Sequence, residues 1–382
     1  MPVPRRMITV LAALTLWLPP AVTSAQPTPP DAAPAQPTPP DAGSVPARWT
    51  TIATGPEGST TCALRDDGTL WCWGSNLSGQ IGDGTTESRS SPVRIGDGRD
   101  WVSVSPGSQH TCGIRGDASL WCWGSDLVGQ LGTGDDDADQ KRPVRVGRTG
   151  AWRSVSAGSG HTCGVRTDGS LWCWGSFEDT EHQSPLRIGT ATDWVSVEAG
   201  HRALCGLRAD RTLWCRPTAG GSLSQVGTAR SWVSVSAGEQ ICAIDSDTAL
   251  WCWDEAPTGS TEPARAGPGH SWASVSAGGT HTCAVTTDGG AWCWGENDEG
   301  QLGDDGRVAS PAPVAVNGDL TVRAVAAGDQ YTCALTTEAR LWCWGENDDG
   351  QLGDGTSASS TMTATVVRVG DLSGWAEVSA GY

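Results

Sequence analysis

The sequence predicts an all-β fold, a seven-bladed β-propeller of four-stranded antiparallel blades with one cross-strand disulfide per blade. Three observations lead to it: a hairpin-like sequence occurs seven times, each copy holds two cysteines ten residues apart, and short strand-like segments flank each copy. Repeats of about 20 to 50 residues are typical of solenoids, propellers and arrays. Four-stranded blades arranged around an axis are the form that matches this repeat.

The cysteines define the repeat unit, because the seven copies account for all 14 cysteines of the chain. In an oxidising compartment, cysteines that face each other on antiparallel strands lie within disulfide distance. Each closed loop should stabilise the fold by about 3 kcal/mol on the chain-entropy estimate. The predicted bonds are Cys62–Cys72, Cys112–Cys122, Cys163–Cys173, Cys205–Cys215, Cys242–Cys252, Cys283–Cys293 and Cys333–Cys343.

The residues between the cysteines fix the register of each hairpin. In the first copy, antiparallel pairing places the two cysteines opposite each other and Ala63 opposite Trp71. Every copy has alanine or glycine facing tryptophan in this way, so we expect the small residue to leave room for the ring opposite it. The three residues at the tip have an acid at their centre in every copy, which suits a three-residue hairpin loop.

Further strands precede and follow each hairpin. Segments of the form "WVSVSAG" come before it, and segments such as "SPVRIG" or "RPVRVG" come after it. Both faces of the hairpin are apolar, with cysteine and leucine on one and tryptophan with alanine or glycine on the other, so each sheet must be covered on both sides. Radial blades, each placed between two neighbours, meet this requirement.

Longer motifs resemble the regulator of chromosome condensation repeat. The segment "HTCGVRTDGSLWCWG" and the loops "GENDEGQLGDDG" and "GENDDGQLGDG" carry the resemblance, which extends over residues 46–382. It implies a seven-bladed propeller. Eukaryotic members promote nucleotide exchange on a small nuclear GTPase and associate with chromatin, and a secreted bacterial propeller that inhibits β-lactamases is similar in setting. The Gly-Gln-Leu/Ile-Gly run begins at Gly79, Gly129, Gly300 and Gly350, and blades 3 to 5 lack it.

The N-terminal segment predicts export. Arg5 and Arg6 precede a short apolar run and then small residues, a pattern typical of a secretory signal cleaved near Ala25. The apolar run is too short to span a bilayer, so we expect no membrane insertion. The tandem "QPTPPDA" favours an extended linker. The expected divisions are a signal peptide over residues 1–25, a proline-rich linker over 26–45 and the propeller over 46–382, in a secreted, periplasmic or cell-surface protein.

The net charge of the chain limits the kinds of partner that it is expected to bind. The formal net charge is −18, and it becomes −20 once Arg5 and Arg6 are removed with the signal. Phosphate backbones and anionic membranes should be repelled by such a surface. We therefore expect no nucleic-acid partner.

No motif for a cofactor, a metal or catalysis stands out. His110, His161 and His281 lie two residues before a cysteine, but structural zinc sites use closely spaced cysteine pairs, and structural roles are expected for these histidines. The acidic loops with Asp135 to Asp137 and with Asp298, Asp304 and Asp305 lack the alternating ligands of a calcium loop, so a solvated surface is expected there. Nucleophile elbows, His-Glu-x-x-His motifs and phosphate-binding loops are missing from the sequence.

The predicted function is that of a secreted, monomeric, non-catalytic scaffold that binds an unknown protein or surface polymer. Blades 3 to 5 have lost the long loop that the other blades keep, so a shallow sector from about residue 175 to 265 should lie beside a high rim. Residues unusual for this chain occur there, and they are the predicted partner-binding residues: Phe177, Glu181, His182, His201 and Arg202. The alternatives are a structural envelope component, exchange-factor activity by family analogy, and an enzyme with a site at the channel mouth.

Closure of the ring leaves one strand over. The segment beginning at Trp49 has an eighth copy at Trp375, whereas only seven hairpins exist. We expect one terminal strand to close the ring beside the blade of the other end, with its duplicate frayed or capping. A chain that has lost part of an eighth blade is the alternative.

Overall fold

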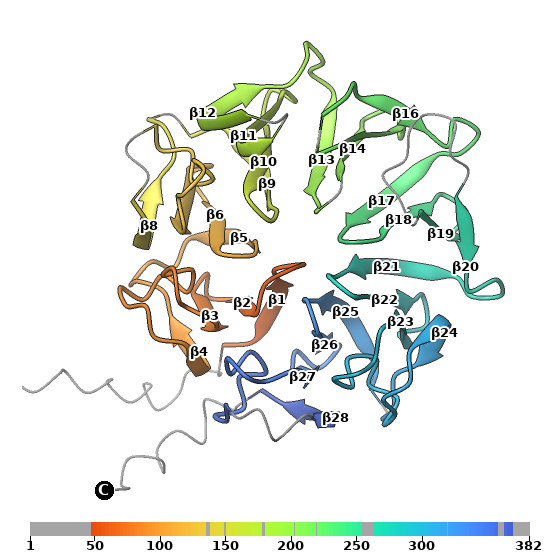
Figure 1. The fold of residues 1–382 in the computed structure, drawn as a ribbon. Helices are drawn as coiled ribbons and strands as arrows, with labels where there is room; N and C mark the ends of the chain where they lie inside the picture. The colour runs from red at the N-terminus through yellow and green to blue at the C-terminus, as the bar shows by residue number, and fades with distance from the viewer. Residues whose placement is uncertain are drawn as a thin grey trace, which may run out of the picture. The chain divides into compact units, whose positions relative to one another are not determined.

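The computed structural model describes residues 47–134, 138–148, 150–177, 180–201, 203–218, 220–253, 263–318, 320–357 and 363–369. The chain divides into residues 1–45 and 46–382, and the described residues all belong to the second unit. This unit is an all-β propeller of seven four-stranded sheets, as the sequence predicts (Figure 1). The predicted signal peptide and linker lie outside the described residues. None of the described residues forms a helix long and apolar enough to span a membrane.

Each blade consists of four consecutive antiparallel strands. The inner strands, which surround the channel in Figure 1, are β1 (Trp49–Thr54), β5 (Trp101–Pro106), β9 (Trp152–Ala157), β13 (Trp194–Ala199), β17 (Trp232–Ala237), β21 (Trp272–Ala277) and β25 (Val322–Ala327). The second strands are β2 (Thr60–Arg65), β6 (His110–Arg115), β10 (His161–Arg166), β14 (Ala203–Arg208), β18 (Ile241–Asp245), β22 (His281–Thr286) and β26 (Tyr331–Thr336).

The third strands complete the hairpins, and the outer strands form the rim of the disc. The third strands are β3 (Leu70–Gly74), β7 (Leu120–Gly124), β11 (Leu171–Phe177), β15 (Leu213–Pro217), β19 (Leu250–Trp253), β23 (Ala291–Gly295) and β27 (Leu341–Gly345). The outer strands are β4 (Arg89–Arg94), β8 (Gln140–Arg145), β12 (Thr180–Arg187), β16 (Ser224–Val226), β20 (Ala264–Ala266), β24 (Ser310–Ala315) and β28 (Thr363–Arg368).

The hairpin register confirms the predicted pairing. Cysteine faces cysteine in every blade, and all seven pairs form disulfides with Cα atoms 4.1 Å apart. The tip is the predicted three-residue loop. The third residue of the tip has a positive φ in every blade, although only three blades have glycine there. Ala118, for example, has a φ of 61° and Arg211 a φ of 66°. The side chain of the central acid accepts the backbone N–H of the second residue after it in several blades, as Asp67 does from Thr69 at 3.1 Å.

The expectation for the small residue opposite tryptophan needs a correction. Gly113 faces Trp121 across the hairpin, but a Cβ atom on Gly113 would lie 2.8 Å from Cζ3 of Trp101. Gly164 and Gly206 are equally close to the inner-strand tryptophans Trp152 and Trp194. The small residue therefore makes room for the ring of the inner strand, which lies across it, and not for the ring opposite it.

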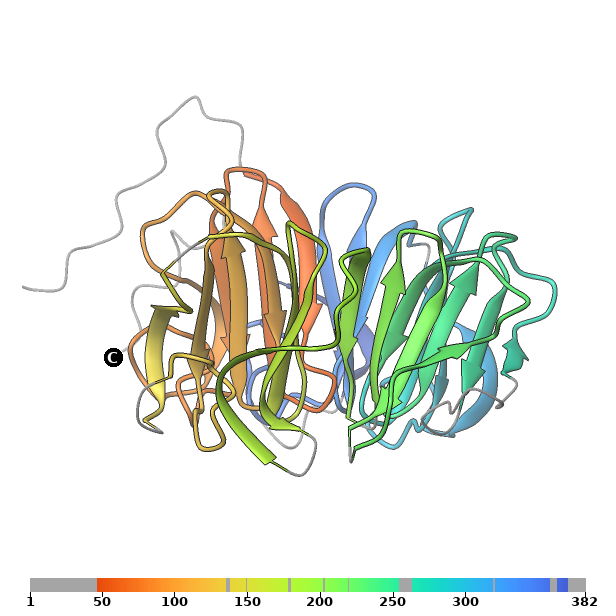
Figure 2. The ribbon, with the colours of Figure 1, turned by 90° about the horizontal axis from the view of Figure 1, so that it is seen from above.

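The hydrophobic core is divided among the seven interfaces between blades. At the interface of blades 2 and 3, the buried disulfide of Cys112 and Cys122 packs with Leu131, and Trp152 and Trp174 of the next blade complete the cluster. Equivalent clusters lie at the other interfaces. Each sheet is thus covered on both faces, as its apolar faces require. Figure 2 shows the disc from its edge, with strands running between its two faces.

Blade 7 packs directly on blade 1 and closes the ring. The hydroxyl of Tyr331 donates to the carbonyl of Thr60 at 3.0 Å, and Nε1 of Trp73 donates to the carbonyl of Gln351 at 2.9 Å. The strand that begins at Trp49 pairs within its own blade as β1, so it is not a strand of the last blade. The copy at Trp375 lies outside the described residues.

Candidate binding site at the mouth of the channel

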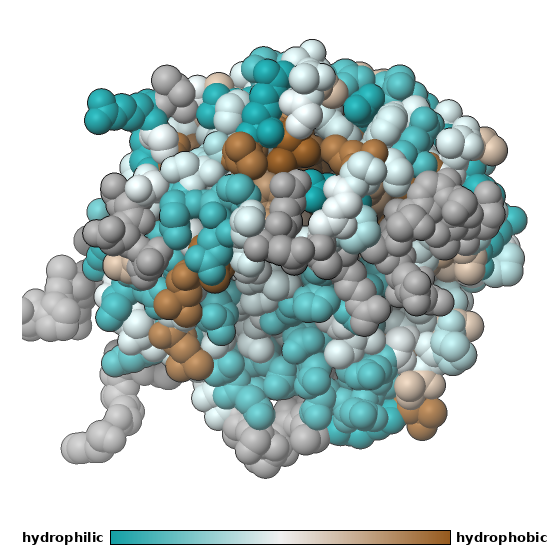
Figure 3. All heavy atoms as spheres, turned by 45° about the horizontal axis from the view of Figure 1, so that its top comes forward, coloured by the Kyte–Doolittle hydropathy of each residue, from teal (hydrophilic) through white to brown (hydrophobic). Residues whose placement is uncertain are grey.

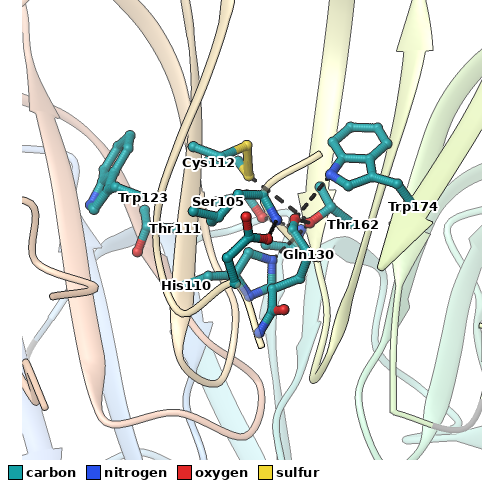
Figure 4. The surroundings of a disulfide bond; sticks show 12 residues. Ser105, His110, Thr111, Cys112, Trp123, Gln130, Thr162 and Trp174 are labelled. Atoms are coloured by element: carbon teal, nitrogen blue, oxygen red, sulfur yellow. Dashed lines mark hydrogen bonds between the residues drawn. A yellow bond between two sulfur atoms is a disulfide. The ribbon is translucent and has the colours of Figure 1, made fainter. Parts of the chain in front are cut away.

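The Gly-Gln-Leu/Ile-Gly loops connect each blade that has one to the next blade. In blade 2, the main-chain carbonyl of Gln130 accepts hydrogen bonds from the hydroxyl of Thr162 at 2.8 Å and from Nε1 of Trp174 at 2.9 Å, both in blade 3 (Figure 4). We call these segments, residues 76–82, 126–132, 297–303 and 347–353, the latch loops. The same two bonds recur at Gln80, Gln301 and Gln351.

Internal bonds hold each latch loop in shape. The side-chain oxygen of Gln80 accepts the N–H of Ser78, and the side-chain oxygen of Asn76 accepts the N–H of Ile81, both at 2.9 Å. Ile81 is fully buried. The last glycine of the loop has a positive φ and lies against the tryptophan of the next blade that donates to the loop carbonyl. A Cβ atom on Gly132 would be 2.5 Å from Nε1 of Trp174. The latch loop is therefore a rigid connector between blades.

Two of the three interfaces without a latch loop have lost the matching hydroxyl. The position of Thr162 is occupied by Leu204 in blade 4 and by Ile241 in blade 5, and both are buried. At the interface of blades 3 and 4, buried Arg216 replaces the tryptophan and lies over the ring of Phe177, 5.8 Å from its centre. A threonine hydroxyl without its carbonyl would be a buried unpaired donor, so apolar residues suit these positions.

The interface of blades 5 and 6 has a different replacement. Blade 6 keeps both donors, Thr282 and Trp294. The side-chain oxygen of Gln240 lies 3.1 Å from Nε1 of Trp294 and 3.4 Å from the hydroxyl of Thr282. A side-chain carbonyl thus does what the main-chain carbonyl of a latch loop does elsewhere.

The latch loops share one face of the disc with the loops that surround the channel. Consecutive strands reverse direction, so the loop after each inner strand and the loop after each third strand lie on the same face, which we call the mouth face. The side chain of Val128 in a latch loop indeed lies 3.6 Å from the Cβ position of Gly160 in a channel loop. Blades 1, 2, 6 and 7 carry latch loops on this face. Blades 3 to 5 lack the latch sequence, and we call their part of this face the low sector, after the shallow region that the sequence predicts there. Residues 254–262, which follow the third strand of blade 5, lie outside the described residues.

Four side chains from different blades meet at the mouth of the channel, and we call them the mouth cluster: Glu57, Ser159, His201 and Glu239. Nδ1 of His201 lies 2.5 Å from Oε1 of Glu57 and 3.3 Å from the hydroxyl of Ser159. The same hydroxyl donates to Oε2 of Glu57. One ligand atom each from Glu57, His201 and Glu239 lie within 4.8 Å of one another. Blades 1, 3, 4 and 5 contribute these residues, so the cluster spans the channel.

Comparisons with known proteins agree with the repeat architecture. One family model of the regulator of chromosome condensation (RCC1) repeat matches residues 50–80, 101–130, 152–181, 272–301 and 322–351, and a second matches residues 67–114, 117–165 and 288–335. The matches together cover more than half of the chain. The chain belongs to the regulator of chromosome condensation repeat family. Neither family model matches residues 182–271, which include all of blades 4 and 5.

Several solved structures share the fold of this chain at low sequence identity. Prp20p of Saccharomyces cerevisiae is 18% identical with a TM-score of 0.71, covering 81% of this chain and 88% of its own. Human WBSCR16 is 17% identical with a TM-score of 0.68, covering 79% and 94%. The ectodomain of the Arabidopsis thaliana receptor kinase ACR4 is 21% identical with a TM-score of 0.53, covering 78% and 96%. The comparison with curated proteins found no match.

The surroundings of the mouth cluster are acidic. Burial, and then Glu57 and Glu296, raise the pKa of Asp329 in the channel loop of blade 7. Burial raises the pKa of Glu346 to about 7, and neighbouring acids add to the effect. Burial also raises the pKa of Glu198 to about 7. Glu198 occupies a position at which Ser156 accepts a hydrogen bond from the next inner strand. An RCC1-type ring therefore surrounds a channel with surplus negative charge at one end.

The predicted partner-binding residues lie in two separate places. Phe177 is only 6% exposed and packs at the interface of blades 3 and 4, with its ring 4.8 Å from that of His182. Glu181 is exposed on β12, the outer strand that also contains His182. His201 belongs to the mouth cluster, and Arg202 lies outside the described residues. Partner binding by these residues stays a prediction, and the burial of Phe177 gives its ring a packing role.

Sequence reasoning missed three members of the mouth cluster. Ser159, His201 and Glu239 directly follow the glycine that comes after an inner strand. Glu57 is the second residue after the corresponding glycine of blade 1. Loops at the same place in every blade converge around the axis, so this position was the available signal. Its residue type differs from blade to blade, which hid it from a search for repeated motifs.

Two of the repeated histidines, His110 and His281, have the hydrogen-bonded structural role that the sequence favours, whereas Nε2 of His161 is buried without a hydrogen-bond partner among the described residues. Nε2 of His110 lies 2.7 Å from the hydroxyl of Thr162, and Nε2 of His281 lies 2.6 Å from that of Thr332 (Figure 4). Burial lowers the pKa of His110 to about 3 and that of His281 to about 4. In the acidic loop of blade 6, Asp304 accepts the side-chain amide of Asn297 at 3.0 Å. Asp135 to Asp137 lie outside the described residues.

Proposed function

We propose that this protein is an exported, monomeric, non-catalytic scaffold that binds a protein or a surface polymer on its mouth face, in the low sector of blades 3 to 5. The observation that carries the proposal is the replacement of the residues that once met the latch loops. Leu204, Ile241 and Gln240 close the three interfaces without a latch, so the low sector is a packed surface that can receive a partner. Random loss of loops would leave a threonine hydroxyl buried without its acceptor at each of these interfaces.

The rim beside the low sector offers an apolar contact. Leu127 at the tip of the blade 2 latch loop is 66% exposed, and Leu77 at the tip of the blade 1 latch loop is 76% exposed. Blades 6 and 7 have Asp298 and Asp348 at this position. Figure 3 shows a surface that is largely hydrophilic, with separate hydrophobic patches. Leu127 borders the low sector directly, so a partner seated there would cover it, and burial of its apolar side chain would favour binding through the hydrophobic effect.

Relatives of the same fold support a protein partner. Prp20p was studied for its binding to Gsp1p and histones, and the yeast protein was also solved bound to Kap60. The net charge of −18 disfavours a nucleic-acid partner for this chain. The ectodomain of ACR4 belongs to a receptor kinase, a setting compatible with the exported location that the N-terminal segment predicts.

A capture experiment tests the proposal. Mature protein would be immobilised and exposed to the native envelope and secreted fractions, and captured partners would be identified by mass spectrometry and measured by titration. Leu127→Asp should weaken binding at least tenfold, because it places a charge on the apolar rim of the low sector. Leu77→Asp is the matched control, since it makes the same change on a latch loop away from that sector.

Several results would contradict the proposal. Equal capture by wild type and both variants would remove the low sector as the binding surface. Nucleotide exchange on a small GTPase would favour the family's exchange activity, and turnover in small-molecule screens without any capture would favour an enzyme. Absence of a specific partner with tight retention in the envelope would favour a structural component.

A further inference from the structure

We propose that the mouth cluster is a binding site for one divalent first-row transition-metal ion, represented by Zn²⁺, with Glu57, His201 and Glu239 as its protein ligands. The three residues each bring one ligand atom into a region where all of these atoms lie within 4.8 Å of one another. They come from loops of blades 1, 4 and 5 that are far apart in the sequence. The site stands independently of the proposed partner binding.

The ligand set suits such an ion. Zn²⁺ binds histidine nitrogen at about 2.0–2.1 Å and carboxylate oxygen at about 2.0–2.2 Å. Imidazole favours zinc, copper and nickel, whereas calcium and magnesium prefer sites made of oxygen alone. The side chain of His201 is 49% exposed, so its ring has room to adjust. Nδ1 of His201 already faces Oε1 of Glu57, and an ion bound by both would replace their direct contact.

The surroundings support the ligands. The hydroxyl of Ser159 donates to Oε2 of Glu57, which leaves Oε1 of the same carboxylate directed toward His201. Bonds of this kind orient metal ligands in known sites. Asp329 lies close by, and the charge of Glu57 contributes to raising its pKa. A cation at the mouth would reduce this repulsion.

The ion would connect distant parts of the ring. Glu57 belongs to blade 1, whereas His201 and Glu239 belong to the neighbouring blades 4 and 5 on the other side of the channel. Three protein ligands leave a zinc ion at least one open position, which water or a carboxylate from outside could fill. Metal binding would therefore tie the low sector to the start of the propeller through a single ion.

Titration with Co²⁺ and Zn²⁺ tests the site. Mature protein with its disulfides intact would be dialysed against a chelator, titrated with Co²⁺ while visible absorbance is recorded, and titrated with Zn²⁺ in a calorimeter. We expect one ion per chain and cobalt bands typical of nitrogen and oxygen ligation. His201→Ala and Glu57→Gln should each weaken binding at least tenfold and change the bands. Asp298→Asn removes a carboxylate from the same face outside the cluster and should change neither.

The outcomes distinguish a specific metal site from weak binding to an acidic surface. Zn²⁺ should raise the melting temperature of wild type and leave that of the variant with all three ligands replaced unchanged. Lack of saturable binding at one ion per chain would overturn the proposal. Wild-type affinity and unchanged cobalt bands in His201→Ala would also overturn it, as would displacement of Zn²⁺ by equal concentrations of Ca²⁺.

Discussion

Blade interfaces with a latch loop and blade interfaces without one are both packed, but different atoms make their contacts. Where a latch loop is present, as between blades 2 and 3, a main-chain carbonyl accepts from Thr162 and Trp174. Where it is missing, one of two changes is found. The receiving blade has Leu204 or Ile241, which have no hydroxyl, or the blade without the loop provides the side-chain carbonyl of Gln240. The comparison shows that the hydroxyl that would face a latch carbonyl is either missing or given a new acceptor where the loop is lost, because a buried unpaired group costs about 1–3 kcal/mol. The match is incomplete at the interface of blades 3 and 4, where Nε2 of His161 is buried without a hydrogen-bond partner among the described residues.

The largest effect should come from crowding a latch. Gly132→Ala places a methyl group against Nε1 of Trp174 at a φ of +70°, and we expect it to lower the free energy of unfolding by about 3 kcal/mol. Gly147 in the same blade has a φ of +68° with nothing within 4 Å of its Cβ position, so Gly147→Ala should cost only about 1 kcal/mol. Urea unfolding with the disulfides intact measures both. Equal losses would show that backbone conformation, and not the latch, decides the cost.

Removing the substitute carbonyl should have the next largest effect. Gln240→Leu leaves Nε1 of Trp294 and the hydroxyl of Thr282 without their acceptor, and we expect a loss of about 2 to 3 kcal/mol. Adding Thr282→Val should recover part of it, because one unpaired donor disappears. Gln109→Leu, at an exposed position of a channel loop, is the control and should have little effect. A loss that Thr282→Val does not reduce would contradict the role assigned to Gln240.

Acid should weaken an interface that uses histidine more than one that uses glutamine. Burial lowers the folded-state pKa of His281 to about 4, below the usual value near 6.5. The unfolded chain therefore binds a proton first, and stability falls as the pH drops from about 6.5 toward 4. His281→Gln introduces the residue that blade 5 has at this position. Between pH 7 and pH 5 the wild type should lose about 2 kcal/mol more than the variant in urea unfolding. Parallel pH profiles would be inconsistent with a neutral buried histidine.

The smallest expected effect concerns the stability of threonine relative to valine, which should differ in sign between a latched and an unlatched interface. At position 111 the hydroxyl donates to the carbonyl of Gln80, so Thr111→Val should cost about 1 kcal/mol. At position 241 no latch carbonyl is present, so Ile241→Val should be more stable than Ile241→Thr by about 1 kcal/mol. Thermal unfolding of the three variants checks both signs. The same preference at the two positions would mean that the latch carbonyl does not select the residue that faces it.

The sequence was sufficient for the disulfide hairpin of each blade, although it did not show that Gly113 leaves room for Trp101 of the inner strand. The disulfides, the register and the three-residue tip all follow from residues at most ten positions apart. Contacts between blades were harder, because they join residues separated by an entire repeat. The hydrogen bond from Trp294 to Gln240 and the meeting of Glu57 with His201 depend on how neighbouring or opposite blades are placed, which no local pattern reports.

Hydrogen exchange along the second strands tests most directly whether the unlatched interfaces are closed. The account predicts that the amides of β14 and β18, at the interfaces without latch loops, are protected to within about tenfold of those of β6 and β10, since buried Leu204 and Ile241 fill these interfaces without an unpaired hydroxyl. Exchange in β14 and β18 that is faster by a factor of a hundred or more, with β6 and β10 still protected, would show that the loss of the latch loops left this sector open and would contradict the account.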